Sequence, residues 1–312
     1  MTTRPAVSVI MPAYNACETL AASVKSVQEQ TLQNWELIIV DDGSTDDTAE
    51  LALALANTDP RICVVQCPNR GPSVARNKGA DLAKALVLAF LDADDLWASD
   101  RLSGMLKAFR DRPKAGVLFS RTRFVDAKSL HPGTLTAHHA RLSAADLMAE
   151  NALCSTSNIV CLKSVFHATQ GFTPGLNHAE DQDWLLRVAL GGQWHIEGLD
   201  QEWFFYRSSE QSQSADLTAM RDGWLQMVGK ACRDFPETGP HAARRAYGPI
   251  HTQLARRALR MAQPRLALHY LFLGLRHDPL MLARQPRRTC LTLAGTLLSF
   301  VPNQSLKELV AR

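Results

Sequence analysis

Three absences exclude common classes of protein for this 312-residue sequence. No Gly-x-Gly-x-x-Gly segment follows the first strand-like stretch, and no Gly-x-x-x-x-Gly-Lys-Ser/Thr motif occurs. The phosphate-binding loops of dinucleotide-binding and P-loop proteins are therefore missing. The longest apolar run lies at 290–302 and has about 12 residues, whereas a helix needs ~20 to span a bilayer. We therefore expect no membrane-spanning segment.

Cysteine is present, but not in a pattern typical of disulfides or zinc sites. The seven cysteines are odd in number, are scattered along the chain and form no Cys-x-x-Cys pair. This pattern favours reduced cysteines in a cytoplasmic protein. The N-terminal residues lead into a strand-like stretch without a positively charged and then apolar leader, so we expect no signal peptide. The predicted location is the cytoplasm, either free or at the inner face of the membrane.

Charge is unevenly distributed, although the net charge of the chain is only +3. Residues 244–312 contain 12 Lys/Arg and two acidic residues, a net charge of +10, which leaves −7 for the first 243 residues. A basic C-terminal region indicates a separate module with an anionic partner or neighbour. Arg284, Arg287 and Arg288 precede an apolar stretch at 291–301. Such a segment can lie on an anionic membrane, pack on the protein as a helical module, or form a dimer, and the sequence leaves these alternatives open.

Strand-like and helical patterns alternate through the first hundred residues. Helices are predicted at 16–30, 48–57 and 73–84, between buried strands at 7–11, 35–40, 61–66 and 86–91. This alternation predicts an α/β fold with a mostly parallel sheet. Beyond this part, the pattern predicts strands at 116–120, 158–162 and 203–206, a helix at 179–190 and an irregular stretch at 121–142. From residue 216 onward the sequence is helical, with breaks at prolines.

Polar residues follow each of the first four predicted strands. In chain order they are Tyr14-Asn15, Asp41-Asp42, Asn69-Arg70-Gly71, and Asp92 with Asp94. The carboxyl ends of parallel strands meet at one edge of an open α/β sheet, which is where ligands bind. The convergence of these clusters therefore predicts a ligand site at that edge.

The pair Asp92 and Asp94 is the most informative of these clusters. Residues two apart in extended backbone point the same way, and neighbouring carboxylates repel each other unless a cation neutralises them. Hard oxygen ligands at the end of a strand suit Mg²⁺ or Mn²⁺ carrying a phosphate-bearing substrate. The alternative is that Asp94 or Asp95 only caps a helix that begins at Leu96. Taken alone, the segment leaves both interpretations open.

Five segments in chain order resemble the motifs of family 2 glycosyltransferases of the GT-A fold. They lie at 9–15 (VIMPAYN), 39–46 (IVDDGSTD), 75–79 (ARNKG), 90–95 (FLDADD) and 179–187 (AEDQDWLLR). The resemblance implies a Rossmann-like, mostly parallel sheet flanked by helices, followed by a C-terminal helical extension. It also implies inverting transfer of a sugar from a nucleotide-diphosphate sugar, with UDP as the first choice, to a hydroxyl acceptor. The expected cofactor is Mn²⁺ or Mg²⁺, and the expected process is cell-surface glycan or glycolipid synthesis.

On the donor side, the resemblance implies nucleotide-sugar contacts for Pro12, Tyr14, Asn15, Asp42, Arg76, Asp92 and Arg207. Asp42 matches the family's base-binding Asp, Tyr14 would lie against the base, and Arg76 would reach the base or the diphosphate. Asp94 matches the metal ligand, and Asp92 matches the partner of the ribose or of the metal ligand. The structural alternatives are that Tyr14 is a half-buried core residue and that Arg76 is only a solvated charge on a helix.

On the acceptor side, Asp181 matches the general base, which deprotonates the acceptor hydroxyl on the face opposite the leaving group. Glu180 and Trp184 match acceptor-binding positions, and Asp183 is expected to be structural. The alternative for the acids is that they stabilise a helix N-terminus through the helix dipole.

The sequence departs from the family pattern at 208–214, where no His occurs, so the late metal or phosphate contact is in doubt. The Gln-x-x-Arg-Trp motif of processive members is also absent, so we expect addition of one sugar. A nucleotidyltransferase and an inactive sugar-nucleotide-binding protein are the alternative functions. The expected partners are a nucleotide-diphosphate sugar and a glycan or lipid-linked acceptor, and no nucleic acid.

The predicted domains are a GT-A catalytic domain at 1–215 and a basic helical region at 216–312. Within the first, the nucleotide-sugar half spans 1–110 and the acceptor half spans 111–215.

Overall fold

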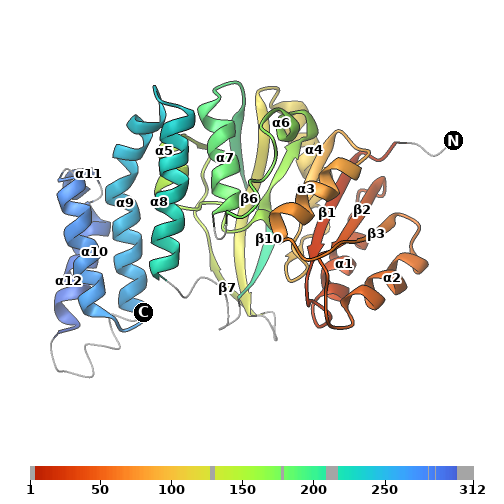
Figure 1. Cartoon of the computed structure of the whole chain (residues 1–312), viewed down its shortest axis with the longest axis horizontal. Coiled ribbons are helices and arrows are strands. Elements are labelled where there is room, and N and C mark those ends of the chain that lie inside the picture. The colour runs from red at the N-terminus through yellow and green to blue at the C-terminus, as the bar shows by residue number, and fades with distance from the viewer. Residues whose placement is uncertain are drawn as a thin grey trace. The chain divides into compact units, whose positions relative to one another are not determined.

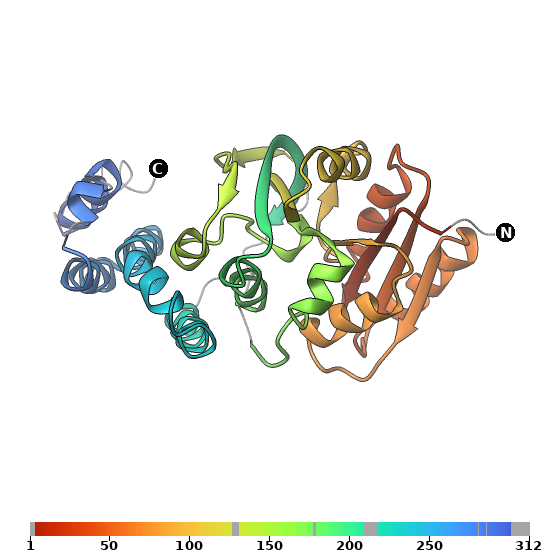
Figure 2. The same cartoon turned by 90° about the horizontal axis from the view of Figure 1, so that it is seen from above.

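The computed structural model describes residues 4–126, 131–176, 179–208, 217–279, 281–284 and 286–300. The chain packs as two compact units, and Figures 1 and 2 show the elements of each. Unit 1 comprises Met1–Leu142 and Ala152–Ser212, and unit 2 comprises Ser143–Asn151 and Gln213–Arg312. The short segment Ser143–Asn151 therefore packs with the C-terminal helices, which the sequence pattern did not predict.

Four parallel strands form the first half of the sheet in unit 1. Across the sheet they follow the order β3 (Ile62–Gln66), β2 (Trp35–Asp41), β1 (Val7–Ala13) and β4 (Val87–Phe90). All four predicted strands are confirmed, because each is a short apolar run bounded by turn residues. β1, β2 and β4 are almost wholly buried, as expected for parallel strands covered on both faces.

Helices connect these strands: α1 (Leu20–Gln28), α2 (Thr48–Thr58) and α3 (Pro72–Leu82). In α1 the apolar side chains of Leu20, Val24 and Val27, which share one face of the helix, are buried. α3 packs closely on β1, since a Cβ atom at Gly79 would lie 2.5 Å from Ile10 Cγ2. The glycine thus lets α3, which carries Arg76, approach the sheet.

The second half of the sheet is mixed. β9 (Val160–Leu162) runs antiparallel to both β4 and β6 (Ala115–Asp126), while β10 (His195–Ser208) runs parallel to β6. Three short strands complete the sheet, all paired antiparallel: β5 (Leu96–Trp97) and β8 (Arg141–Leu142) with β10, and β7 (Pro132–Leu135) with β6. The carboxyl end of β10 therefore lies at the same sheet edge as the carboxyl ends of β1, β2 and β4.

The irregular stretch predicted at 121–142 is only partly correct. β6 continues to Asp126, and β7 and β8 follow, while residues 127–130 lie outside the described part of the chain. The long β10 pairs with β6 along its length, and Arg123 of β6 forms an ion pair of 2.6 Å with Glu202 of β10. Pairing with a strand some 80 residues away stabilises the extended backbone, which a local sequence pattern does not reveal.

The remaining helices of unit 1 are α4 (Arg101–Asp111), the 3₁₀ turn η1 (Thr156–Asn158), α6 (Lys163–Ala168) and α7 (Glu180–Leu190). The predicted helix at 179–190 is thus confirmed.

Unit 2 is helical, as predicted from residue 216 onward. It contains α5 (Ala144–Ala149), α8 (Leu217–Asp234), α9 (Gly239–Arg260), α10 (Pro264–His277), α11 (Met281–Arg284) and α12 (Pro286–Leu298). α9 is the central helix and contacts α5, α8, α10 and α12 (Figure 1). Across the residues that the structure describes, no helix combines the length and apolarity needed to cross a bilayer.

Candidate active site

The polar loops after β1 and β2 are hydrogen-bonded to each other at the carboxyl edge of the sheet. Asn15 Oδ1 accepts a hydrogen bond from Thr45 N at 2.8 Å, and Asn15 N donates to Ser44 Oγ at 3.1 Å. Asn15 has φ 48°, a left-handed conformation that asparagine tolerates better than most residues. Asn15 therefore shapes the loop, and its side-chain carbonyl is engaged within the protein.

Asp42 joins the end of β2 to the start of α3. The residue is 4% exposed, and its two carboxylate oxygens accept hydrogen bonds from Arg70 N at 2.9 Å and Gly71 N at 2.8 Å. A base contact would use the remaining lone pairs of these oxygens. Asp41 stabilises the turn after β2, because its Oδ1 accepts a hydrogen bond from Ser44 N at 3.2 Å.

Tyr14 and Pro12 lie beside these loops. Tyr14 is 51% exposed, so its ring is available to a ligand and is not the core residue of the structural alternative. Pro12 is half-buried at the end of β1, opposite Val40 of β2.

Arg76 connects three segments that are far apart in the sequence. Its guanidinium donates to Asp92 Oδ1 at 2.6 Å and to Glu180 Oε1 at 3.0 Å. Only 6% of the Arg76 side chain is exposed, so these ion pairs are shielded from water. Burial alone would lower the pKa of Arg76, but the two carboxylates raise it above its ordinary value and keep the group charged. Arg76 is therefore not a solvated helix charge.

Asp92, Asp94 and Asp95 form an acidic cluster after β4. Burial, together with the charges of Asp94 and Asp92, raises the pKa of Asp95 well above its ordinary value. The crowding of protein atoms around the Asp94 carboxyl and the charge of Asp92 also raise the pKa of Asp94, although the residue as a whole is exposed. Carboxyl groups in such an environment favour a proton or another cation.

Ser155 and Ser157 support this cluster from the segment before β9. Ser155 Oγ lies 3.3 Å from Asp92 Oδ2 and 3.4 Å from Asp95 Oδ2, and Asp92 N donates to Ser157 Oγ at 2.9 Å. Neither serine was among the site residues predicted from the sequence. The polar run Ser-Thr-Ser-Asn at 155–158, directly before an apolar stretch, was the signal that could have found them.

Arg207 at the end of β10 also reaches the cluster. Its Nε donates to the backbone carbonyl of Asp94, its backbone N–H donates to Asp95 Oδ1 at 3.1 Å, and its Nη2 donates to Ser23 Oγ at 2.8 Å. Burial lowers the pKa of Arg207, while the charges of Asp94 and Asp95 act in the opposite direction. Across the described residues no acceptor is bound to Arg207 Nη1, so this nitrogen is available to a ligand.

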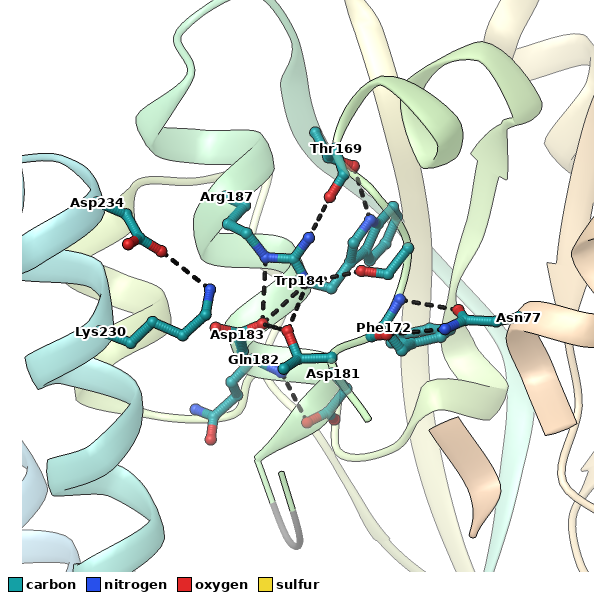
Figure 3. Close-up of polar contacts among 12 residues, drawn as sticks. Asn77, Thr169, Phe172, Asp181, Gln182, Asp183, Trp184, Arg187, Lys230 and Asp234 are labelled. Carbon is teal, nitrogen blue, oxygen red and sulfur yellow. Dashed lines mark hydrogen bonds and ion pairs between the residues drawn. The ribbon is translucent and has the colours of Figure 1, made fainter. Parts of the chain in front are cut away.

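The first turn of α7 carries Glu180 and Asp181, and Figure 3 shows Asp181 in that turn. Asp181 is 8% exposed, and its Oδ1 accepts from Gln182 N at 2.7 Å. Because Arg76 binds Glu180, this turn is held next to the helix α3 and to Asp92. The predicted base is thus adjacent in sequence to a residue that is tied to the acidic cluster.

Hydrogen bonds from and to side chains of α7 fix the segment that precedes this helix (Figure 3). Arg187 donates to Asp183 Oδ2 from Nε at 3.1 Å and from Nη2 at 2.8 Å, and it also donates to the carbonyls of Thr169 and Gly171. Thr173 Oγ1 donates to the same Asp183 oxygen at 2.7 Å. Asp183 therefore has the structural role expected for it.

Trp184 lies in the core and not at the acceptor position. It is 0% exposed, its ring packs against Phe166 and Phe172, and its Nε1 donates to Thr169 Oγ1 at 2.8 Å (Figure 3). Trp184 sits on the helix face that packs inward, so it offers an acceptor no surface. We therefore replace the predicted acceptor contact of Trp184 with a packing role.

The acidic cluster fits a divalent cation in charge and in ligand type. When all groups are ionised, four carboxylates face two guanidinium groups, so two negative charges are not compensated. The carboxylates belong to Asp92, Asp94, Asp95 and Glu180, and the guanidinium groups to Arg76 and Arg207. Oxygen ligands suit Mg²⁺ or Mn²⁺. In the described ranges, no three His, Cys, Asp or Glu side chains form a complete metal site, so substrate phosphate and water would have to supply ligands.

The family model described as Glycosyl transferase family 2 matches residues 8–167, just over half of the chain. The chain belongs to glycosyl transferase family 2.

Curated relatives match this family 2 chain over about a third of its length. The putative teichuronic acid biosynthesis glycosyltransferase TuaG of Bacillus subtilis is 44% identical over 110 residues, which are 35% of this chain and 44% of that protein. The Escherichia coli protein WfgD, named UDP-Glc:alpha-D-GlcNAc-diphosphoundecaprenol beta-1,3-glucosyltransferase, is 40% identical over 96 residues, which are 31% and 38% of the two chains. The matched part therefore spans less than half the length of these relatives.

Solved structures of low sequence identity share the GT-A fold with this family 2 chain. The mannosyltransferase PcManGT of Pyrobaculum calidifontis, in complex with GDP-Man and Mn²⁺, has a TM-score of 0.63 at 21% identity, covering 99% of this chain and 85% of that one. S. aureus TarS in complex with UDP-GlcNAc has a TM-score of 0.58 at 17% identity, covering 90% and 92%. The predicted GT-A fold class is confirmed.

Proposed function

We propose that this protein is an inverting glycosyltransferase that moves one sugar from a nucleotide-diphosphate sugar to a hydroxyl acceptor. The observation that carries the proposal is the buried contact of Arg76 with Asp92 and Glu180. Asp92 belongs to the donor-side acidic cluster, and Glu180 begins the helix that carries Asp181. Family membership supports glycosyl transfer as the reaction.

Asp181 is the proposed general base. An acceptor hydroxyl that attacks the anomeric carbon must lose its proton on the face opposite the departing nucleotide, and a single carboxylate can accept that proton. One direct displacement inverts the anomeric configuration, through a transition state with oxocarbenium character. Glu180, fixed by Arg76, is proposed to orient the acceptor.

The donor is proposed to bind at the edge formed by the loops after β1, β2 and β4. Tyr14 offers an exposed ring for the base, with Pro12 and Asn15 shaping its pocket, and Asp42 offers carboxylate lone pairs. Asp92 would lie near the ribose, and Arg76 and Arg207 bring positive charge towards the diphosphate. Arg76 Nε supports this role, because it is buried and has no hydrogen-bond partner among the described residues.

Asp94 is the proposed protein ligand of Mn²⁺ or Mg²⁺. When bound, the cation would neutralise charge that develops on the departing nucleotide diphosphate. The residues already present fit it, because the neighbouring acids leave negative charge uncompensated. PcManGT, which shares the fold, was solved in complex with Mn²⁺, and this supports the same choice.

UDP is the proposed nucleotide, and a lipid-linked or glycan hydroxyl in cell-surface glycan synthesis is the proposed acceptor. The names of WfgD, with its UDP-Glc donor and diphosphoundecaprenol acceptor, and of TuaG support both choices. GDP is the competing nucleotide, because PcManGT was solved with GDP-Man. The proposed location is the cytoplasmic side of the membrane, where such an acceptor would be met.

The test has two steps. Thermal shifts with UDP, dTDP and GDP, each with and without Mn²⁺, identify the nucleotide, because a ligand that binds the folded state raises its stability. Asp181→Asn is then assayed with the corresponding sugar donor. We expect transfer to fall by about 10²–10⁴-fold, as for loss of a general base, while the nucleotide-induced shift stays unchanged. Transfer at the wild-type rate would show that the base is misassigned.

A further inference from the structure

Unit 2 has a pocket of about 530 Å³ that is formed by α9 and the end of α10. His241, Arg244 and Arg245 line it from the first two turns of α9, and His277 and Asp278 line it from the end of α10. The side chains from α9 are all exposed, as is His277. None of these residues belongs to the acidic cluster.

The pocket carries net positive charge. Two arginines face one carboxylate, so the charge of the lining is +1 without any contribution from the histidines. Asp278 is only 6% exposed, whereas the arginines extend into solvent. An anion therefore meets mainly positive groups.

A packed aromatic layer supports the pocket wall. Tyr247 stacks on His277 with ring centroids 5.0 Å apart and an interplanar angle of 27°, and Trp224 meets Tyr247 edge-on at 5.1 Å. Trp224 is itself fixed, because its Nε1 donates to Met148 O at 2.6 Å. His277 is therefore held in place before any ligand arrives, which lowers the entropy cost of binding.

We propose that this pocket binds a phosphate group. Guanidinium groups bind phosphate through paired, charge-assisted hydrogen bonds, and the histidines add further N–H donors. The volume exceeds that of a single phosphate and leaves room for the group that carries it. The ligand class is thus a phosphate ester, either free in solution or as the headgroup of an anionic lipid. The site is independent of the sugar-transfer reaction proposed for unit 1.

The primary test is calorimetric titration of the full chain with pyrophosphate. We expect Arg244→Gln/Arg245→Gln to weaken binding by at least ~10-fold, because two charge-assisted contacts are lost. The control Arg260→Gln/Arg265→Gln removes the same charge from exposed positions, and Arg260 lies roughly 24 Å along α9 from Arg244. The control should stay within about 2-fold of wild type. His277→Gln gives a second variant, with an intermediate loss expected.

Two results would overturn the proposal: no saturable binding of pyrophosphate by the wild type, or equal losses in the two double variants. Circular dichroism confirms that each variant is folded. Vesicle co-sedimentation separates the two ligand sources, using phosphatidylcholine with and without phosphatidylglycerol. If only Arg244→Gln/Arg245→Gln loses binding to the anionic vesicles, the ligand is a lipid headgroup. If vesicle binding is unchanged while pyrophosphate affinity falls, the ligand is a free phosphate ester.

Discussion

Replacing Arg76 with Met tests the contact that joins the donor side of the site to α7. Met keeps an unbranched stem as far as the position of Arg Nε, but it leaves the Asp92 and Glu180 carboxylates without their cation. These carboxylates are only 22% and 15% exposed, so water cannot fully replace the guanidinium. Removing one partner of a buried ion pair costs about 3–5 kcal/mol. We expect the lower end, about 3 kcal/mol, because the carboxylates retain some solvent contact.

The assay is differential scanning calorimetry. For a unit of roughly 200 residues, a loss of about 3 kcal/mol lowers Tm by about 6–12 °C. Lys78→Met is the matched control, since Lys78 is exposed on the same helix and loses the same charge, and it should change stability by less than about 0.5 kcal/mol. Adding Glu180→Gln to Arg76→Met removes one of the unpaired charges and should recover about 1 kcal/mol. Two results would contradict a stabilising role for the buried ion pairs of Arg76. One is an equal loss of stability in the Arg76 and Lys78 variants. The other is strict additivity of the stability changes caused by Arg76→Met and Glu180→Gln.

Two further predictions concern acid stability and the C-terminal surface. The hydrogen bonds from Arg61 lower the pKa of Asp59 to about 2, below the ~3.9 of a carboxyl group in an unfolded chain. Asp59 therefore contributes about 2–3 kcal/mol to the stability of the folded state; this contribution is fully present above about pH 5 and is lost as the pH falls towards 2. In urea titrations, Asp59→Asn should be less stable than wild type at pH 6, with the difference shrinking below pH 4; a constant difference would contradict the assignment. Leu291 and Leu297 are 73% and 57% exposed on α12. If this helix contacts membrane, replacing both with Ser should reduce co-sedimentation with anionic vesicles by at least ~10-fold, because each CH₂ group removed from the contact costs ~0.8 kcal/mol. Unchanged vesicle binding, with a concentration-dependent sedimentation coefficient that the variant loses, would favour dimerisation instead.

The sequence predicted those parts of the fold that depend on local patterns. The strands β1, β2 and β4 are mostly apolar runs, and polar or acidic residues follow each of them directly. The sequence therefore predicted both the strands and the edge of the sheet where the site lies. The prediction of an irregular stretch at 121–142 was wrong where β6 pairs with β10, a strand far away in the chain. Propensity is a weak guide when tertiary pairing decides the backbone.

Side-chain partners at the site were less predictable than its location. Arg76 was expected near the diphosphate, but its ion pair with Glu180 crosses more than a hundred residues and has no local signal. Trp184 continued the motif pattern, yet helix periodicity directs it into a cluster of aromatic rings. Arg101 shows the same limit: it is 0% exposed and bonded to Ser120 and Asn158, an environment that an arginine in the sequence does not suggest.

The placement of the cation at the acidic cluster can be tested by measuring Mn²⁺ binding in the presence of the nucleotide that the thermal-shift panel identifies. Electron paramagnetic resonance measures free Mn²⁺ as it is titrated into the wild type and into Asp94→Asn, each saturated with the nucleotide. We expect the variant to bind Mn²⁺ at least ~10-fold more weakly, since its only proposed protein carboxylate ligand is lost. Equal Mn²⁺ affinity in the two proteins would contradict the placement of the cation at the acidic cluster.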